Sequence, residues 1–268
     1  MKRRAGKTHE NRQLKKVGLA RALSKLGYCS RSNAAELIRA GRVKLNGVLR
    51  RYPETPVHIG RDGIEVDGKT VNRSPKIYLA MNKPGGVVTS ASDEEGRETV
   101  YAYLPKSLPW LAPVGRLDKA SEGLLLFTND SEWAARVTAP ETHLDKTYHV
   151  QIGTVADEAL LAGLRNGVQS EADFLRVKNA RLLRHGDRNS WLEIVLDEGK
   201  NRHIRRLLEH LQIEVLRLVR VAMGPLRLGE LAKGTTRTLT GEEKRALDRT
   251  MRIQNNPSPS IDSVSKLV

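Results

Sequence analysis

A run of consecutive apolar residues behind a glycine-bounded turn constrains the fold of this chain more than any other feature. Residues 124–127 are Leu-Leu-Leu-Phe, and a short apolar block of this kind is typical of a buried strand. The turn before it, residues 115–123, carries Asp118 behind Arg116. A polar loop positioned by a rigid strand is a common place for catalytic side chains, so Asp118 is a candidate catalytic acid. Taken alone, an aspartate in a turn is usually a turn former or a helix cap.

Strand and helix patterns alternate irregularly over residues 77–252. Segments with strand character are 77–81, 86–89, 123–128, 147–152, 174–183, 191–196 and 214–223. Segments with helical character are 100–104, 131–138, 157–165, 202–210 and a helix after Thr240, where Thr240 and Glu243 form a capping-box pattern. Strands interrupted by helices in this way predict an α+β domain with a mixed, mostly antiparallel sheet and flanking helices.

A smaller α/β module is predicted over residues 17–71, joined to the larger domain by a linker at 72–76. Its expected elements are helices over 19–26 and 30–41, the second capped by Ser30, and strands over 43–45 and 64–66, with a hairpin turn at Asn46-Gly47. Two short helices followed by a small sheet make a compact unit that is separate from the large sheet.

The positive charge of the chain is concentrated in its first quarter. Residues 1–76 carry 19 Lys+Arg against 6 Asp+Glu, whereas residues 77–268 carry 27 against 25. This asymmetry indicates a polyanionic partner, and nucleic acid is favoured because neutralising its phosphates releases counterions. A solvated, solubilising surface is the simpler alternative. We expect residues 1–16 to be a disordered basic arm and residues 253–268 a disordered tail.

Several classes of site are disfavoured by the sequence. A single cysteine excludes an intramolecular disulfide and a cysteine-based zinc site, and scattered histidines give no metal-ligand spacing. No glycine-rich nucleotide-binding motif is present, and an aromatic content of 4% argues against an aromatic stacking sheet for RNA. With no apolar run of about 18 residues and no secretory pattern, we expect a cytoplasmic protein that uses no metal.

Three further segments carry polar groups at the ends of predicted strands. They are 82–89 (Asn-Lys-Pro-Gly-Gly-Val-Val-Thr), 146–150 (Lys-Thr-Tyr-His-Val) and 197–208 (Asp-Glu-Gly-Lys-Asn-Arg-His-Ile-Arg-Arg-Leu-Leu). Together with 115–130 they resemble, in the same order, segments of the RsuA-type ribosomal RNA pseudouridine synthases. Residues 23–27, 30–31 and 35–47 resemble an S-four-like RNA-binding module, so the resemblance covers about 17–250.

The resemblance implies a role for each matching residue. Asp118 matches the essential aspartate, Tyr148 the tyrosine that packs against the target base, and Arg205 the basic residue that pairs with the aspartate. Arg116 matches an arginine that helps fill the gap left by an extruded base. The residues expected to bind RNA are Arg116, Arg31, Arg39, Arg42, Lys44, Lys83, Lys200 and Arg202. Two positions depart from the family pattern: Ser121 stands where threonine is commoner, and His203 where glutamine is commoner.

The chemistry implied by the resemblance is the isomerisation of a uridine to pseudouridine in ribosomal RNA. No atom is gained or lost, so no cofactor is needed, and one carboxylate suits an oxocarbenium-like sugar centre. Asp118 either attacks the anomeric carbon or removes a sugar proton. The uridine must be flipped out of its stack, and Tyr148 offers a stacking surface. The expected partner is structured ribosomal RNA, with no membrane contact and a monomeric protein.

Two other functions fit part of the sequence. A non-enzymatic RNA-binding or ribosome-assembly factor would use the basic module without chemistry at Asp118, and a transfer-RNA enzyme would apply the same chemistry to another RNA. The combination of Asp118, Tyr148 and Arg205 favours an enzyme over the first, while the sequence leaves the RNA class to experiment.

Deleting residues 1–71 is expected to weaken RNA binding and to flatten its dependence on salt. Each phosphate contact that is lost should lower the slope of log affinity against log salt by about 0.7–0.9. Affinity of the full chain and the truncated chain for a ribosomal RNA fragment, measured from low to high salt, checks this. An unchanged slope would show that the charge asymmetry has no part in RNA binding.

Overall fold

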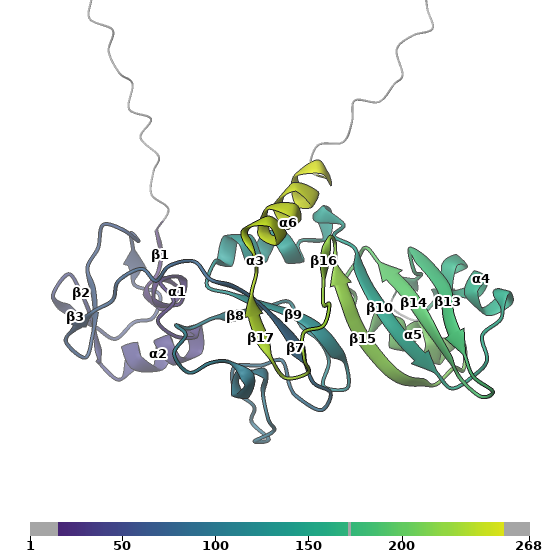
Figure 1. Ribbon diagram of the computed structural model, residues 1–268. Helices are drawn as coiled ribbons and strands as arrows, with labels where there is room; N and C mark the ends of the chain where they lie inside the picture. Colours follow the sequence, from purple (N-terminus) through teal and green to yellow (C-terminus); the bar gives the residue numbers. More distant parts are fainter. Residues whose placement is uncertain (1–15, 171–172, 255–268) are drawn as a thin grey trace, which may run out of the picture. The chain divides into compact units, whose positions relative to one another are not determined.

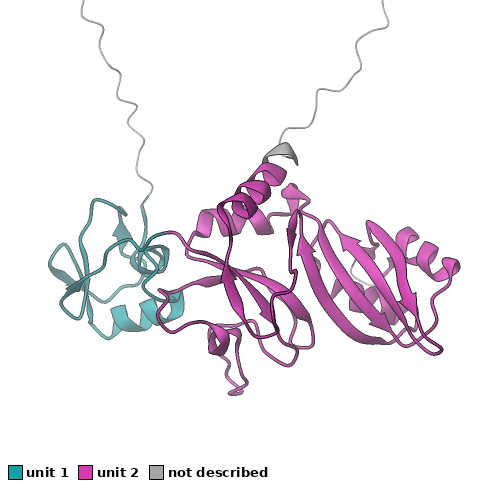
Figure 2. Ribbon diagram, viewed as in Figure 1, with its two compact units in different colours: residues 1–75 teal, residues 76–268 magenta. Residues whose placement is uncertain are grey.

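The computed structural model describes residues 16–170 and 173–254. The chain divides into two compact units, Met1–Pro75 and Lys76–Val268, coloured separately in Figure 2. Apart from residue 16 and residues 253–254, the arm expected at 1–16 and the tail expected at 253–268 lie outside the described residues. Residues 253–254 belong to a helix, so the last helix continues past the expected boundary at 252.

The first unit is a helical pair beside a small antiparallel sheet. Helices α1 (Leu19–Lys25) and α2 (Arg31–Arg39) precede a sheet of order β3 (Val48–Arg50), β2 (Val43–Leu45), β5 (Ile64–Val66) and β6 (Lys69–Thr70), and β1 (Val17–Gly18) pairs with β4 (Pro56–Val57). As predicted, Ser30 caps α2, because its hydroxyl oxygen accepts from the Asn33 amide at 3.1 Å. Leu19, Leu23 and Ile38 are fully buried between these elements.

The second unit is built on a nine-stranded sheet (Figure 1). Its main path is β13 (Asn179–His185), β14 (Ser190–Leu196), β10 (Lys146–Ile152), β15 (Val215–Met223), β9 (Glu122–Thr128), β7 (Tyr78–Lys83) and β17 (Thr236–Thr238), with β16 (Leu226–Arg227) on β15 and β8 (Ala112–Val114) on β9. Every pairing in this sheet is antiparallel except β9 with β15. The prediction of an α+β fold with a mixed, mostly antiparallel sheet is confirmed.

Helices cover different faces of the two halves of this sheet. Helices α4 (Glu158–Asn166) and α5 (His203–His210) pack on β10, β14 and β15 around Leu164, Ile194 and Leu207, and lie behind these strands in Figure 1. Helices α3 (Ser131–Thr138) and α6 (Gly241–Gln254) enclose a second core on β7, β9 and β16. Two 3-10 turns, η1 (Val100–Tyr103) and η2 (Pro140–Thr142), lie in the connections.

Three predicted elements differ from the structure. The strand expected over 174–183 is two strands, β12 (Phe174–Leu175) paired with β11 (Val168–Gln169), and β13, because the Val177 amide between them donates to the Leu164 carbonyl of α4. The segment 86–89 contributes only an isolated bridge between Val88 and Thr99. The helix expected over 100–104 is the 3-10 turn η1.

A glycine makes the parallel pairing of β9 and β15 possible. Gly123 lies opposite Arg220 with φ +100°, a backbone conformation that side-chain-bearing residues rarely adopt. A Cβ atom at this position would lie 2.3 Å from the Arg220 carbonyl oxygen and 2.8 Å from its amide nitrogen. The two strands approach closely only because residue 123 has no side chain.

Gly123→Ala should therefore destabilise the larger unit by about 3 kcal/mol or more, since both the conformation and the contact with a neighbouring backbone become unfavourable. Gly163→Ala is the matched control: Gly163 lies inside α4 with nothing within 4 Å of an added Cβ, and alanine there should stabilise by up to about 1 kcal/mol. Urea unfolding followed by tryptophan fluorescence checks both, because all three tryptophans lie in the larger unit. Equal stabilities for the two variants would contradict the inference that the β9–β15 pairing requires a glycine at position 123.

Candidate active site

Strand register aligns Tyr148 with the start of β9. Tyr148 on β10 pairs with Arg220 on β15, Arg220 pairs with Gly123 on β9, and Gly123 pairs with Lys83 on β7. Adjacent strands lie about 4.8 Å apart, so the backbones of Tyr148 and Gly123 are about 10 Å apart. Asp118 lies five residues before Gly123, in the loop that enters β9. The register therefore places Tyr148 level with the first residues of β9, next to the point where the loop enters the sheet.

Lys83 holds the backbone of the Asp118 loop (residues 117–121) in place. Its side chain is fully buried, and Nζ donates to the carbonyl oxygens of Ser121 at 2.8 Å, Pro84 at 3.0 Å, Asp118 at 3.3 Å and Lys119 at 3.4 Å. Burial lowers the pKa of this ammonium to about 8, while the carboxylates of Glu122 and Asp118 oppose the shift. Lys83 cannot reach an RNA phosphate in this conformation, so the prediction that it binds RNA is corrected.

Arg205 reaches the same loop from α5. Its Nη2 donates to the Ala120 carbonyl oxygen at 3.2 Å. Burial lowers the pKa of the Arg205 guanidinium, Arg202 lowers it further, and the Asp118 carboxylate opposes both effects. Asp118 and Arg205 are thus electrostatic neighbours, although their side chains form no ion pair within 4.0 Å in the described part of the chain. The arginine holds the loop backbone instead of the carboxylate itself.

The carboxylate of Asp118 is open to a ligand. The side chain is half-buried, and the loop turns tightly after it, because the Ser121 amide donates to the Asp118 carbonyl oxygen at 2.9 Å. Within the described residues, no side chain donates a hydrogen bond to this carboxylate. The loop backbone is therefore held in place while its acid remains available.

Tyr148 packs between the α4–α5 core and a third hydrophobic cluster next to this loop. Its half-buried ring packs against the α4–α5 core and also against the cluster that contains Leu117, the residue before Asp118. Val150, two residues further along β10, is fully buried in the same α4–α5 core, as expected for alternate residues of a strand. Asp118, Tyr148 and Arg205 therefore come together in one region from three distant segments.

Three polar atoms around the Asp118 loop are buried without a hydrogen-bond partner: Ser121 Oγ, Arg205 Nε and Arg220 Nη2. Arg220 is 5% exposed, and its Nε donates to the Leu124 carbonyl oxygen at 2.7 Å. Buried polar groups are normally satisfied, so these three atoms require a water or ligand as partner, because the described residues supply none. Sequence reasoning missed Arg220, although a charged residue between the apolar residues of strand 214–223 was a visible signal.

The other basic candidates lie at the surface with different surroundings. Arg116 is exposed in the segment that leads to Asp118, and Arg202 is exposed at the start of α5. Lys200 is half-buried, donates to the Phe174 carbonyl oxygen at 2.8 Å and pairs with Glu198 at 3.0 Å, so its charge is already engaged.

His203, where the family pattern differs, is buried at 3% exposure. Burial lowers the pKa of its imidazole, which favours a neutral ring at pH 7.

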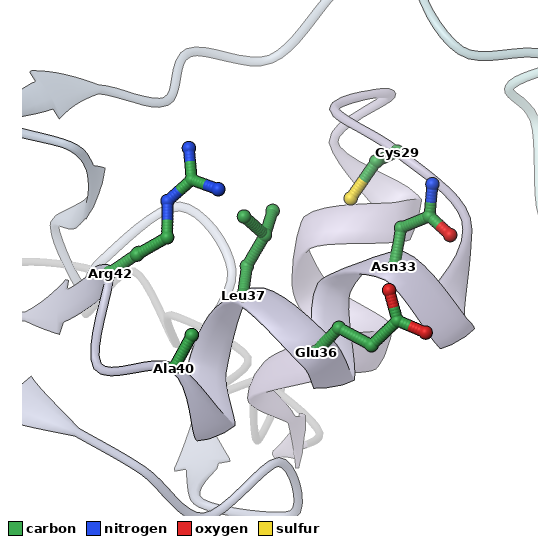
Figure 3. A pocket seen from close by; sticks show the side chains of 6 residues that line it. All are labelled: Cys29, Asn33, Glu36, Leu37, Ala40 and Arg42. Carbon is green, nitrogen blue, oxygen red and sulfur yellow. The ribbon is translucent and has the colours of Figure 1, made fainter.

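Arg31, Arg39, Arg42 and Lys44 are all exposed on the first unit. Arg42 is partly neutralised, because its guanidinium binds the Asp67 carboxylate, with Nε 2.9 Å from Oδ1. It also borders a hollow of about 290 Å³ with Cys29, drawn in Figure 3. Burial raises the pKa of the Cys29 thiol to about 11, so this sulfur is protonated and unreactive at neutral pH.

Comparison with known proteins gives a consistent result. Residues 77–210 match the family model of RNA pseudouridylate synthases, and residues 17–62 match the S4 domain. A Rickettsia typhi protein named as an uncharacterized RNA pseudouridine synthase is 38% identical over 226 residues, 84% of this chain and 92% of the relative. The ribosomal large subunit pseudouridine synthase B of Bacillus subtilis is 35% identical over 232 residues, 85% of this chain and 94% of the relative.

A solved structure supports the same relationship. A crystal structure described as a pseudouridylate synthase aligns with a TM-score of 0.61 and 29% identity, covering 86% of this chain and 99% of that chain. The alignment spans both units of this chain, so the likeness is not limited to the large sheet.

Lys83 predicts a specific dependence of stability on pH. Its pKa is about 8 in the folded protein and about 10.5 in an unfolded chain, so the unfolded chain binds more protons between these values. The free energy of unfolding that this group contributes should therefore rise by about 3 kcal/mol from pH 8 to pH 10.5. Urea unfolding of wild type and Lys83→Met at several pH values checks this, because other groups cancel in the difference. A difference independent of pH would refute the lowered pKa.

Proposed function

The protein belongs to the RNA pseudouridylate synthase family, and from this membership we propose that it converts a specific uridine of ribosomal RNA to pseudouridine, with Asp118 as the catalytic carboxylate. The observation that carries the proposal is the Asp118 loop: Lys83 and Arg205 hold its carbonyl oxygens, while the carboxylate stays free of hydrogen bonds from the described residues. A fixed backbone and an open acid suit a residue that acts directly on a substrate.

The reaction needs one carboxylate and no exchange of atoms with a cofactor. The bond between C1′ of the ribose and N1 of uracil breaks, the uracil turns, and a bond forms between C1′ and C5. C5 loses its proton, and N1 gains one, so atoms and electrons balance. Asp118 either forms a bond to C1′ during the exchange or removes a sugar proton to assist departure of the base. Both routes need a carboxylate with room for the ribose beside it, and the described residues donate no side-chain hydrogen bond to that of Asp118.

Tyr148 and Arg116 take the roles of base support and gap filler in this proposal. The Tyr148 ring packs against the α4–α5 core and against the cluster that contains Leu117, so it offers a rigid surface beside the loop for a flipped base. Stacking of about 1–3 kcal/mol offsets part of the few kcal/mol that base extrusion costs. Arg116 is exposed two positions before Asp118, and in this proposal it enters the gap that the base leaves in the stack.

The RNA class follows from the relatives and from the charge of the first unit. The Bacillus subtilis relative is named for the large ribosomal subunit, and residues 17–62 match an S4 domain. We propose large-subunit ribosomal RNA as the substrate, bound by the monomeric protein in the cytoplasm. The exposed residues Arg31, Arg39 and Lys44 would contact phosphates, which supply affinity and orientation, and the exposed Arg202 would contact the RNA near the Asp118 loop. No helix in the described part of the chain is long and apolar enough to cross a membrane.

Asp118→Ala and Asp118→Asn should abolish tritium release from ribosomal RNA labelled at uracil C5, with RNA affinity changed by less than about threefold. Asp187→Asn, an exposed aspartate in the turn between β13 and β14, is the control and should retain wild-type activity. Release by either Asp118 variant at the wild-type rate would remove this residue from the mechanism. Binding without any release by wild type would favour an RNA-binding assembly factor, and release only from transfer RNA would move the reaction to that substrate.

A further inference from the structure

A hollow of about 310 Å³ is lined in part by Arg205, the residue that binds the backbone of the Asp118 loop. One wall is α5 with the residue before it, and the other is the segment that joins α5 to β15. Because β9 and β15 run parallel, the start of β15 and the loop that enters β9 lie toward the same end of these two strands. Arg205 belongs to both places: it lines the hollow, and its Nη2 holds the Ala120 carbonyl oxygen. A group bound in the hollow is therefore one side chain from the proposed catalytic loop.

The lining of the hollow combines charged, polar and apolar side chains. Arg205 and Glu209 are four residues apart and lie on one face of α5, and Arg202 is the residue that precedes this helix. Glu214 and the Gln212 amide come from the joining segment, and Ile213 and Val215 are half-buried apolar side chains that pack against the α4–α5 core. A few polar groups beside apolar side chains are typical of sites for small organic groups.

The charges around the hollow do not neutralise one another. In the part of the chain that the structure describes, neither Arg202 nor Arg205 forms an ion pair with Glu209 or Glu214. Opposite charges that share a hollow without pairing leave both donors and acceptors available to a ligand. The carboxylates disfavour a phosphate, because like charges repel. A neutral group that accepts hydrogen bonds on one side and donates them on another suits this set of charges.

The backbone has an uncommon conformation at a residue just before α5 and at one just after it. Arg202 has φ +47° and Gln212 has φ +59°, values in the left-handed region that few non-glycine residues adopt. Both residues line the hollow. The turns at the two ends of α5 thus direct two polar side chains towards the same space.

We propose that this hollow binds a guanine base of the substrate RNA that lies near the target uridine. Guanine offers O6 and N7 as acceptors for a guanidinium, and N1–H and the N2 amino group as adjacent donors for a carboxylate. Uracil, cytosine and adenine lack that adjacent pair of donors. The proposal rests on the function proposed above and adds a specificity site: Glu209 and Glu214 select the base, and the shared Arg205 couples its binding to the Asp118 loop.

Replacing guanine by inosine tests the site, because inosine lacks only the N2 amino group. A ribosomal RNA fragment that wild type modifies is prepared with inosine at each guanine within three nucleotides of the target, one at a time. At one position kcat/KM for wild type should fall about tenfold, the discrimination typical of one good base contact. The double variant Glu209→Gln/Glu214→Gln should lose this discrimination and treat both RNAs alike. Glu230→Gln, an exposed glutamate outside the hollow, should retain it.

The outcomes separate this inference from the function on which it rests. Wild type that modifies the unsubstituted fragment but is insensitive to inosine at every position overturns the guanine site and leaves the proposed function intact. Full discrimination by the double variant overturns it as well. A wild-type protein that modifies no ribosomal RNA contradicts the proposed function itself. Circular dichroism of each variant confirms that the exposed substitutions leave the fold unchanged.

Discussion

Hydrogen bonds from cations to main-chain carbonyl groups are the interaction on which the rest of this site depends. Lys83 donates to the carbonyl oxygens of residues 118, 119 and 121, Arg205 to that of residue 120, and Arg220 to that of residue 124. Hydrogen bonds from charged donors are stronger than neutral ones, and these come from β7, α5 and β15. Because the cations bind carbonyl oxygens, they fix the position of Asp118 without occupying its carboxylate. The loop is thereby rigid and its acid is available, a combination that a direct ion pair would not give.

Local patterns in the sequence were sufficient for most of the scaffold. The strands predicted over 147–152 and 191–196 are β10 and β14, and the capping pattern at Thr240 and Glu243 is confirmed by reciprocal hydrogen bonds of 2.8 and 3.1 Å. Errors arose where tertiary contacts override local preference. The Val177 amide binds the end of α4, which interrupts a strand that the sequence alone predicts as continuous. Strands of two or three residues, such as β8 and β17, carry too few residues for any period to be visible.

The site was predicted less well, for a different physical reason. Tyr148, Asp118 and Arg205 were grouped by resemblance to a family, since no local pattern connects segments so far apart. Lysine is almost always exposed, so Lys83 was expected at the surface, and only the packing of β7 against the loop shows a buried ammonium. Arg220 was overlooked inside a strand. In both cases the side chain donates to carbonyl groups of a distant segment. Those contacts exist only when the strands of the sheet are assembled, so no local pattern in the sequence indicates them.

The parallel pairing at Gly123 has a consequence for how the protein is made. Its partner, Arg220, follows 97 positions later in the chain, so this contact cannot form early in synthesis. At about 5–20 residues per second, a ribosome needs roughly 5–20 s to travel from one to the other. For most of that interval the nascent chain contains Asp118 but lacks Arg205, which holds the Ala120 carbonyl oxygen of its loop. The Asp118 loop therefore gains its contact with α5 and its strand pairing only after most of the larger unit has been synthesised.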